Sequence, residues 1–457
     1  MKSQVAVIGS GPGGAIAAFY LAQAGLDVAL IEEGGEEVTP AFSLKELRSK
    51  YRGKGQTVAF GSPPIQYVEG CTVGGGSEIN SGLYHRLPDS IRKEWEKRLQ
   101  IDSFSSSHLE PHYRECERIL SVQTSPSSVG LASLKMVEGS ARLNWKVVEV
   151  PRWYSQEGIR HSMSHTFISE FIRCSGRLFS HTKVARLIRA KEGWKIKTSK
   201  GDFTAKTVFL SAGTIQTPWL LKRSGIQKNI GKELALHPTV KLTARFPEEI
   251  NGENGGVPVH QVKEFSPSIS LGGSISRLPH LMAAHAHLPE FPEWFLKHWK
   301  HLFTYYAMIS SSTRGKVHSI PGCSAPFVTY QMSEEDKILL GEGQKKLAAL
   351  LFAAGAEEVI SPSGGRFTDP SRLPGIDKKT KGVMTIHLVG SCPMGENRLL
   401  SACDSFGKVH EVENLYISDG SLLGGSPSVN PQGIIMALAR RNVIHFLSKR
   451  GLWKHSS

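Results

Sequence analysis

Short apolar runs alternate with glycine-rich turns at the beginning of the chain. Residues 5–8 (VAVI) are rich in β-branched side chains, which is typical of a strand buried in a parallel sheet. A helical pattern follows over residues 15–24, and residues 28–31 form a second apolar run that leads into Glu32. Strand, helix and strand in this order predict a βαβ unit and an α/β fold.

The second half of the chain has a different pattern. Strand-like segments lie at 240–246, 268–276, 305–310 and 326–331. Residues 334–354 have the pattern of a long helix that ends at Gly355. The stretch 361–382 is rich in Gly, Pro, Ser and Lys, which predicts an exposed loop. Because 457 residues exceed one ordinary domain, we expect two regions around a shared cleft.

An unusual aromatic stretch lies at residues 291–308. Its large rings are Trp294, Phe295, Trp299, Phe303, Tyr305 and Tyr306, set among Lys and His. We favour packing in a core as its role. A lid, an apolar substrate entrance, or a contact with a membrane or a partner remains open as an alternative.

The composition is that of a globular protein with enough apolar residues for a core, since 40% are hydrophobic and 21% are charged. The formal net charge is +14, from 55 Lys and Arg against 41 Asp and Glu. No run of Lys or Arg concentrates this charge and no nucleic-acid-binding motif accompanies it, so we expect a solvated basic surface and no nucleic acid. An anionic membrane surface or an acidic redox partner remains an alternative.

Six cysteines are present, without a CxxC pair or a Cys/His spacing that would hold a metal. We therefore expect reduced thiols and no metal site, as in a cytoplasmic protein. No apolar run reaches the roughly 18 residues that a membrane-spanning helix needs. The first strand begins near Gln4 and leads directly into a glycine motif, so we expect no signal peptide. These features together predict a cytoplasmic location.

The glycine motif has the form GxGxxG and occupies residues 9–14 (GSGPGG). Gly9 permits a tight turn, Gly11 lets a pyrophosphate approach the backbone, and Gly14 lets the helix pack closely on the strand. The helix N-terminus offers free N–H groups to the phosphates. Glu32 is placed to accept hydrogen bonds from ribose hydroxyls. The motif predicts a dinucleotide site; the acid argues against NADP but does not separate FAD from NAD.

Further segments carry glycines and polar residues in regular positions. They are GCTVGGGSEINSGLYHRLP at 70–88, LSAGTIQTPWLLKRSGI at 210–226, GKELALHP at 231–238, HLVGSCPMG at 387–395 and NLYISDGSLLGGSPSVNPQGIIMALARRN at 414–442. Together with the opening motif, they resemble the glucose–methanol–choline (GMC) family of flavin oxidoreductases from one end of the chain to the other. His387 begins the family pattern H-x-x-G-[ST]-C-x-M-G.

The resemblance implies a Rossmann-like FAD-binding domain and a substrate domain built on an antiparallel β-sheet, which would roof the flavin. The FAD-binding domain would be discontinuous and comprise residues 1–90, 180–238 and 385–457. Residues 91–179 and 239–384 would form the substrate-binding or cap region.

The resemblance also implies which residues contact FAD. They are Gly9, Gly11, Gly14, Glu32, Gly74, Gly75, Gly76, Ser77, Asn80, Val184, Ala212, Gly213, Asp419, Gly420, Asn430 and Pro431. Some family members attach FAD covalently through a histidine of the glycine-rich loop. This chain has Ile79 at that position, so we expect noncovalent FAD.

His387 and Asn430 match the pair that faces the flavin in the family. The resemblance implies that His387 takes the hydroxyl proton of an alcohol while hydride passes to flavin N5, and that the Asn430 amide donates to the developing alkoxide. Histidine suits this task because its ordinary pKa is about 6.5. Asn430 could also cap the last helix. His237, in a segment that borders the family's active site, is expected to be structural rather than catalytic.

The sequence therefore predicts an FAD-dependent oxidoreductase that acts on the CH–OH group of a small-molecule alcohol. A hydroxynitrile-lyase-like enzyme, a flavin subunit of a redox complex and an NAD-dependent enzyme remain alternatives. The substrate, the oligomeric state and the electron acceptor (oxygen, a quinone or a redox protein) are not identified by any motif, so oxidase and dehydrogenase both remain open.

Overall fold

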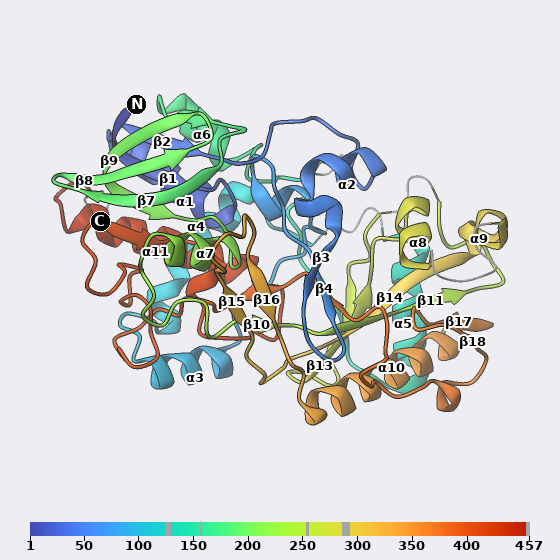
Figure 1. Cartoon of the computed structure of the whole chain (residues 1–457). Coiled ribbons are helices and arrows are strands. Elements are labelled where there is room, and N and C mark those ends of the chain that lie inside the picture. The colour runs from blue at the N-terminus through green and yellow to red at the C-terminus, as the bar shows by residue number, and fades with distance from the viewer. Residues whose placement is uncertain (125–128, 156–157, 253–255, 286–292, 454–457) are drawn as a thin grey trace.

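The computed structural model describes the chain except for residues 125–128, 156–157, 253–255, 286–292 and 454–457. Two large β-sheets with their covering helices form two halves that lie side by side (Figure 1). The N-terminus and helix α11 belong to the half with the first sheet, and the long helix α10 belongs to the other (Figure 1). A cleft between two such halves is the arrangement that the chain length predicted.

The first sheet contains the predicted βαβ unit. Its strands lie in the order β6-β2-β1-β9-β8-β7, with β21 beside β9. Strands β1, β2, β6, β9 and β21 are parallel, whereas β7 and β8 form an antiparallel extension. The bounds are β1 Lys2–Ile8, β2 Val28–Ile31, β6 Arg177–Phe179, β7 Val184–Ala190, β8 Gly193–Thr198, β9 Gly201–Leu210 and β21 Leu415–Ile417. This confirms the Rossmann-like part of the predicted fold.

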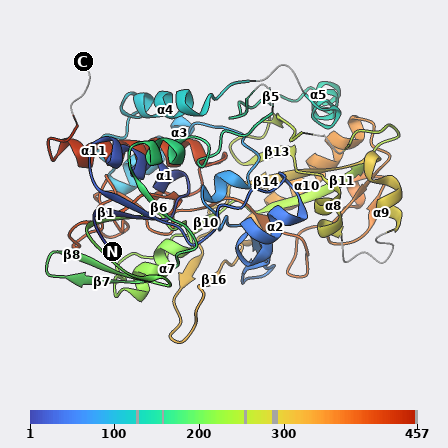
Figure 2. The ribbon, with the colours of Figure 1, turned by 90° about the horizontal axis from the view of Figure 1, so that it is seen from above.

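Helices that are distant in sequence gather on one side of the first sheet. They are α1 Pro12–Gln23, α3 Asp89–Leu99, α4 Ser106–Leu120, α6 Phe167–Arg173 and α11 Gln432–Ser448 (Figure 2). Helix α1 is buried along most of its length because it packs on the sheet, on α6 and on α11. Helix α7 Gln216–Arg223 and the β7–β8 hairpin lie on the other side (Figure 2).

The second sheet has the strand order β3-β4-β19-β11-β14-β13-β12-β5, with β17 beside β11 and β18 beside β17. Its described pairs are antiparallel, apart from β4 with β19. The bounds are β3 Thr57–Ala59, β4 Ile65–Tyr67, β5 Val147–Glu149, β11 Thr239–Arg245, β12 His260–Val262, β13 Ile269–Gly273, β14 Leu302–Ile309, β17 Glu358–Ile360, β18 Arg366–Phe367 and β19 Met384–Thr385. The predicted antiparallel sheet is thus confirmed.

The two faces of the second sheet differ in character, because successive side chains of a strand point to opposite faces. One face is apolar and packs on α5 Leu131–Leu143 and α10 Glu334–Ala353. Its central residues are Val240, Leu242, Leu271, Tyr305 and Ala307. The alternate residues are more polar and line a cavity between the halves; they include Thr239, Lys241, Thr304 and Tyr306.

One strand-like segment does not join this sheet. Residues 327–329 of the segment 326–331 form β16, which pairs with β15 Lys316–His318 in a separate two-stranded sheet. Phe327 of this hairpin stacks on Phe60 at a centroid distance of 4.9 Å. The backbone of Phe60, directly after β3, also pairs with the hairpin: Phe60 N donates to the Val328 carbonyl and Tyr330 N donates to the Phe60 carbonyl, both at 2.8 Å. The hairpin is therefore attached to the β3 edge of the large sheet by this bridge and by the ring contact.

The aromatic stretch contributes mainly to packing, as we favoured. Residues 291–292 lie outside the described residues, and α9 Glu293–His298 follows them. Phe295, Phe303 and Tyr305 are buried, and Trp294 and Trp299 pack on a small apolar cluster. Tyr306 is different, because it lines the cavity.

We propose a domain division close to the one that the resemblance implies. The first sheet and its turns come from 1–90, 180–238 and 385–457, and most of the second sheet comes from 239–384. Two boundaries differ in this proposal. Strand β6, from the segment 91–179, pairs with β2 and belongs to the first sheet. Strands β3 and β4, from the segment 1–90, belong to the second sheet.

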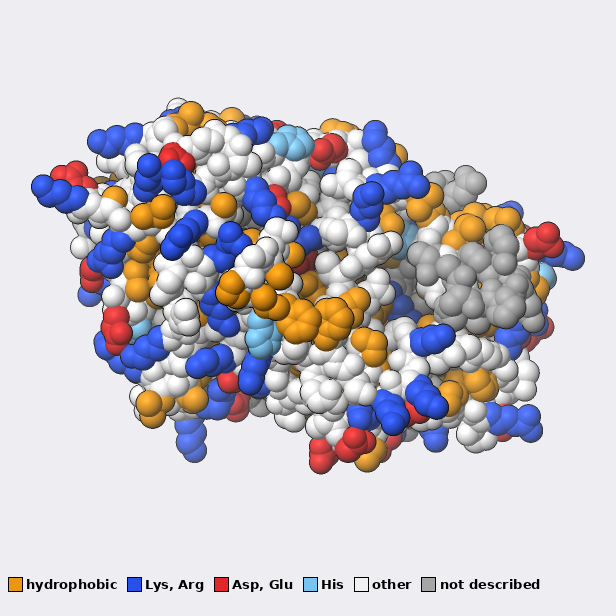
Figure 3. All heavy atoms as spheres, in the orientation of Figure 1, with side chains coloured by type: hydrophobic (Ala, Val, Ile, Leu, Met, Phe, Trp, Pro, Cys, Tyr) orange, Lys and Arg blue, Asp and Glu red, His pale blue; other side chains and the backbone are white. Residues whose placement is uncertain are grey.

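The face drawn in Figure 3 carries basic side chains over both halves. Lys and Arg side chains are spread across the face in Figure 3, and apolar side chains gather over β3, β4 and β16. All six cysteines are free thiols. In the described ranges, no helix has the length and apolar character that crossing a membrane requires.

Candidate active site

A cavity of about 700 Å³ lies between the two sheets. The ends of β1, β2 and β9 and the start of α1 line one part of it. The polar face of the second sheet lines another, and residues 386–388 and 430–432 lie between them in the lining. Ligands of open α/β sheets bind at the carboxyl ends of the strands, which is where this cavity lies.

The turn after β1 brings three backbone segments into contact. Gly9 has a φ of +95°, and a Cβ there would lie 2.2 Å from the Ser211 carbonyl oxygen. A Cβ on Gly13 would lie 1.7 Å from the Ser418 carbonyl oxygen, and one on Gly14 would lie 1.9 Å from that of Gly9. Because no side chain fits at these positions, glycines allow α1 to pack onto the ends of β9 and β21.

Three other glycines leave open space where a side chain would stand. A Cβ on Gly76 would have no atom within 4 Å, and Cβ atoms on Gly11 and Gly213 would each have a single neighbour at 4.0 Å. All three glycines line the cavity. Bare backbone that faces an open cavity at the start of a helix fits a bound dinucleotide, since its phosphates approach N–H groups closely. The residues present therefore fit FAD.

Glu32 lies at the end of β2 and also lines the cavity. Its Oε2 accepts hydrogen bonds from Ser10 N at 2.9 Å and Ser10 Oγ at 2.7 Å, and its Oε1 accepts from Gly34 N at 2.8 Å. Burial raises the pKa of this carboxyl, while these hydrogen bonds act in the opposite direction. A carboxylate accepts about four hydrogen bonds, so one remains for a ribose hydroxyl.

Asp419 joins the end of β21 to the start of α7. Its Oδ2 accepts from Gly213 N at 2.9 Å and from Thr217 Oγ1 at 2.5 Å, and its Oδ1 accepts from Ser421 N at 2.8 Å. Burial raises its pKa and the hydrogen bonds from Ser421 and Thr217 oppose this. The carboxylate thus fixes the backbone of residues 213–217 at the cavity wall.

Two histidines from different segments meet beside Asn430. His387 Nδ1 lies 2.8 Å from His237 Nδ1, and His387 Nε2 lies 3.4 Å from Asn430 Nδ2. Because an amide nitrogen only donates, His387 Nε2 is the acceptor, and its Nδ1–H donates to His237. His237 then carries its proton on Nε2, which donates to Ser426 Oγ at 2.6 Å. This pattern leaves the basic nitrogen of His387 beside the amide of Asn430.

Burial keeps both rings uncharged. His387 is 7% exposed and His237 is 1% exposed. Burial, and to a smaller extent the charge of Lys263, lowers the pKa of His387 to about 4. Burial and the neighbouring His387 lower the pKa of His237 well below its ordinary value. At neutral pH, His387 is therefore able to accept a proton.

Asn430 does not cap the last helix. The N-cap of α11 is Pro431, and no side chain caps its first turn. Asn430 instead lines the cavity next to His387. Its side chain is thus available for a ligand rather than for the helix end.

Most of the residues expected to bind FAD or to act in catalysis line this cavity. They are Gly9, Gly11, Glu32, Gly75, Gly76, Asn80, Val184, Ala212, Gly213, His387, Asp419, Gly420, Asn430 and Pro431. Gly14, Gly74 and Ser77 are not in the lining. Gly14 packs on Gly9, Gly74 N donates to Ser10 Oγ at 3.0 Å, and Ser77 Oγ donates to the Gly74 carbonyl at 2.8 Å. These three residues stabilise the turns without lining the cavity.

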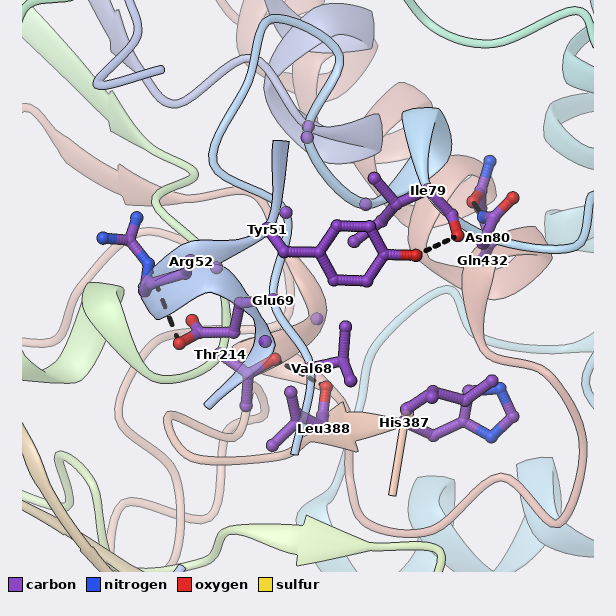
Figure 4. Close-up of a pocket in the computed structure, with 18 of the residues that line it drawn as sticks. Tyr51, Arg52, Val68, Glu69, Ile79, Asn80, Thr214, His387, Leu388 and Gln432 are labelled. Carbon is purple, nitrogen blue, oxygen red and sulfur yellow. Dashed lines mark hydrogen bonds and ion pairs between the residues drawn. The ribbon is translucent and has the colours of Figure 1, made fainter. Parts of the chain in front are cut away.

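A charged cluster in the lining was not anticipated from the sequence. Arg52 lies 2.9 Å from Glu33 and 3.8 Å from Glu69, and Lys183 lies 2.9 Å from Glu33. Figure 4 shows Arg52 and Glu69 on one side of the cavity and the Tyr51 ring between them and Ile79, whose carbonyl accepts from Tyr51 Oη at 3.4 Å. None of the motifs contains these residues. The one hint in the sequence was Glu33, the second acid after β2.

Comparisons with known proteins agree over the whole chain. Residues 47–239 and 313–439 match the GMC oxidoreductase family, and residues 4–44 match an FAD binding domain. An uncharacterized GMC-type oxidoreductase, y4nJ of Sinorhizobium fredii, is 34% identical, with 96% of this chain and 94% of the relative covered. A long-chain-alcohol oxidase of Arabidopsis thaliana is 26% identical over 98% of this chain and 69% of the relative.

Solved structures share the fold at low sequence identity. Pyridoxine 4-oxidase from Mesorbium loti has a TM-score of 0.76 at 15% identity, with 98% of this chain and 99% of that chain covered. A formate oxidase variant from Aspergillus oryzae has a TM-score of 0.78 at 15% identity, with 99% of each chain covered. With the family matches, these findings establish that the chain belongs to the GMC oxidoreductase family and is an FAD-dependent oxidoreductase acting on the CH–OH group of donors.

Proposed function

We propose that the cavity binds FAD noncovalently and that the enzyme oxidises a small-molecule alcohol to an aldehyde or ketone, with His387 as the base and Asn430 assisting. The observation that carries this proposal is the uncharged His387, whose Nε2 accepts beside the Asn430 amide at 3.4 Å. FAD, when bound, supplies the acceptor of the hydride. The protein must then remove the hydroxyl proton and orient the alcohol.

His387 Nε2 would accept the hydroxyl proton while Asn430 Nδ2 donates to the same oxygen. The resulting imidazolium donates from both nitrogens, and His237 Nδ1 already accepts from Nδ1–H at 2.8 Å. A charged donor strengthens this hydrogen bond. His237 would therefore hold the ring in one orientation in both protonation states, as a positioning residue.

Backbone and carboxylate groups would hold FAD. Gly11, Gly76 and Gly213 leave space in front of their backbone, and Glu32 retains an acceptor for a ribose hydroxyl. Ile79 lines the cavity with an apolar side chain that forms no covalent bond to a ring. We expect acid or heat to release the flavin from the denatured chain; colour that stays with the polypeptide would contradict noncovalent binding.

Names of relatives support an alcohol as the substrate. They include long-chain-alcohol oxidases of Arabidopsis thaliana and a 2-methyl-1,2-propanediol dehydrogenase of Mycolicibacterium austroafricanum that is 26% identical over 96% of this chain. Both oxidase and dehydrogenase names occur among these relatives, so oxygen and other acceptors are both to be tested.

Anaerobic addition of primary and secondary alcohols to the purified protein tests the proposal. We expect the yellow flavin to bleach with the substrate alcohol, because oxidation transfers two electrons to it. Cleavage of a substrate without bleaching would support a lyase, and a colourless protein that cannot take up FAD would contradict the proposal. Readmission of air then identifies the acceptor class, since rapid recolouring requires oxygen to accept the electrons.

A further inference from the structure

A lysine without a partner lies in the substrate half of the cavity. Lys241 is on β11, on the face that lines the cavity, whereas its neighbours Val240 and Leu242 are buried in the core. In the part of the chain that the structure describes, no hydrogen bond or ion pair involves its amine, and burial alone lowers its pKa to about 8. The amine is therefore largely protonated at neutral pH, and no carboxylate of the described residues pairs with it.

Every acid among the described residues of the cavity lining already has protein partners elsewhere. Glu32 accepts from Ser10 and Gly34, and Asp419 accepts from Gly213, Thr217 and Ser421. The remaining two, Glu33 and Glu69, contact Arg52 at 2.9 and 3.8 Å. These four carboxylates belong to the cofactor half, so none of them neutralises Lys241.

A tyrosine lies on the strand next to that of the lysine. Tyr306 of β14 pairs with Lys241 across the two strands and also lines the cavity. Side chains of directly opposite residues start about 4.5–5.5 Å apart. Gln261 Nε2 donates to Tyr306 Oη at 2.9 Å, which leaves the hydroxyl proton of Tyr306 free to donate. This hydroxyl lies over β13, because a Cβ on Gly272 would be 2.4 Å from Tyr306 Oη, and β13 is on the side of β14 away from Lys241. The Lys241 ammonium is therefore the group of this pair that would meet an anion.

The third polar group of this wall carries no charge. His280 of α8 Leu278–His285 lines the cavity, and burial followed by the charges of Lys241 and Arg277 lowers its pKa to about 4. Among the described residues that line this end of the cavity, Lys241 carries the one buried positive charge, because Lys381 is exposed and Arg277 lies outside the lining. A single charge favours a monoanion over a phosphate dianion, because the second charge of a dianion would remain unpaired in a buried site.

The course of the chain into β11 sets the distance between Lys241 and the base His387. His237, which contacts His387, precedes Lys241 by four residues, or about 13 Å of extended chain. The flexible lysine side chain shortens this separation. A ligand that reaches both groups therefore places its anionic end on the order of 10 Å from the carbon next to His387.

We propose that Lys241 binds a carboxylate of the substrate, and that the enzyme oxidises alcohols whose chain carries a carboxylate at its far end. This inference rests on the proposed function, because it assigns the oxidised carbon to the His387 end of the same cavity. An unpartnered lysine inside a protein is costly unless an anion meets it, and the substrate supplies that anion.

The test compares a series of ω-hydroxycarboxylates with their methyl esters, which have nearly the same length and no charge. For the wild type, we expect kcat/KM to pass through a maximum with chain length for the acids and to be lower for the ester at that length. Lys241→Met should lower kcat/KM by roughly 10²-fold for the acid and change it by less than about threefold for the ester. Lys241→Arg should retain most of the preference for the acid.

A matched control is available in the same cavity. Lys381 lines the mouth and is exposed, so Lys381→Met removes the same charge from solvent-screened surroundings and should change both kcat/KM values by less than about threefold. Equal values for acid and ester in the wild type would overturn the inference. So would an equal loss for both substrates in Lys241→Met, or a loss of bound FAD in that variant.

A binding measurement separates failure of this inference from failure of the proposed function. Alkanoates of the best chain length lack the hydroxyl and cannot be oxidised, and we expect them to perturb the flavin absorption spectrum of the wild type with a Kd that rises about 10²-fold in Lys241→Met. If no alcohol bleaches the flavin, the proposed oxidation fails while this titration still decides the role of Lys241. An unchanged Kd in the variant would contradict that role.

Discussion

The two halves of the cavity are built in different ways. The cofactor half consists of backbone at strand ends, where Gly9, Gly13 and Gly14 are required because a Cβ would lie within 2.2 Å of a carbonyl oxygen. The roof consists of strand side chains such as Lys241 and Tyr306, and the backbone there would accept many residue types. Close backbone packing requires glycine at fixed positions, so the cofactor half has a recognisable sequence motif. The roof has no such requirement and therefore no motif.

This difference separates two kinds of change. A substitution in the cofactor half should affect folding or FAD binding, whereas a substitution in the roof should affect the choice of substrate. His387 and Asn430 lie between the halves. Their loss should therefore slow the chemical step, with little effect on FAD binding or on the choice of substrate.

The base gives the largest effect. His387→Gln should lower turnover by about 10²–10⁴-fold, the usual contribution of a general base, while FAD content stays at the wild-type level. His318→Gln, on the separate β15–β16 hairpin, is the matched control and should leave turnover unchanged. Steady-state kinetics and flavin absorbance measure both; turnover near the wild type in His387→Gln would refute its role.

The amide beside the base comes next. Asn430→Ala should slow anaerobic flavin reduction by about 10²-fold, because a donor to the developing charge is lost. Since Asn430 does not cap α11, the unfolding temperature should change little. Stopped-flow absorbance and thermal unfolding measure these effects. A large fall in the unfolding temperature with an unchanged rate would indicate a structural residue instead.

Two glycines of one turn should respond differently. Gly11→Val fills open cavity space and should raise the Kd for FAD by about 10–100-fold without destabilising the apoprotein. Gly13→Ala forces a Cβ to 1.7 Å from a backbone oxygen and should destabilise the fold by more than about 2 kcal/mol. Flavin titration and urea unfolding distinguish these results; similar behaviour of the two variants would break the distinction.

The smallest effect is expected from the positioning residue. His237→Leu removes the acceptor of His387 Nδ1–H and should lower kcat about tenfold with little change in KM. His237→Gln keeps an acceptor oxygen and should recover most of the rate. Equal losses in the two variants would show that His237 contributes packing rather than orientation of the base.

The sequence predicted the cofactor half because its geometry demands particular residues. Gly9 with its positive φ and the acid after β2 occupy positions that few other residues could fill. The family resemblance and the two-sheet fold followed from such segments and are confirmed. His387 was recognisable only within its nine-residue pattern.

The remaining features depend on contacts across long stretches of chain. His237 and His387 are 150 residues apart, and nothing in either segment indicates that their rings touch. A lysine within the strand-like segment 240–246 does not reveal whether it faces solvent or a cavity. Arg52 and Glu69 likewise meet only after β3 and β4 fold back along the cavity wall. These residues therefore required the structure.

The pH dependence of anaerobic flavin reduction tests the central claim most directly. Burial lowers the pKa of His387 to about 4, so its protonated form, which cannot act as a base, should appear only at low pH. We predict a rate constant that is level from about pH 8 to about pH 5 and falls as pH decreases through about 4. A fall centred on the ordinary histidine pKa of about 6.5, or a profile that His387→Gln leaves unchanged, would contradict the account.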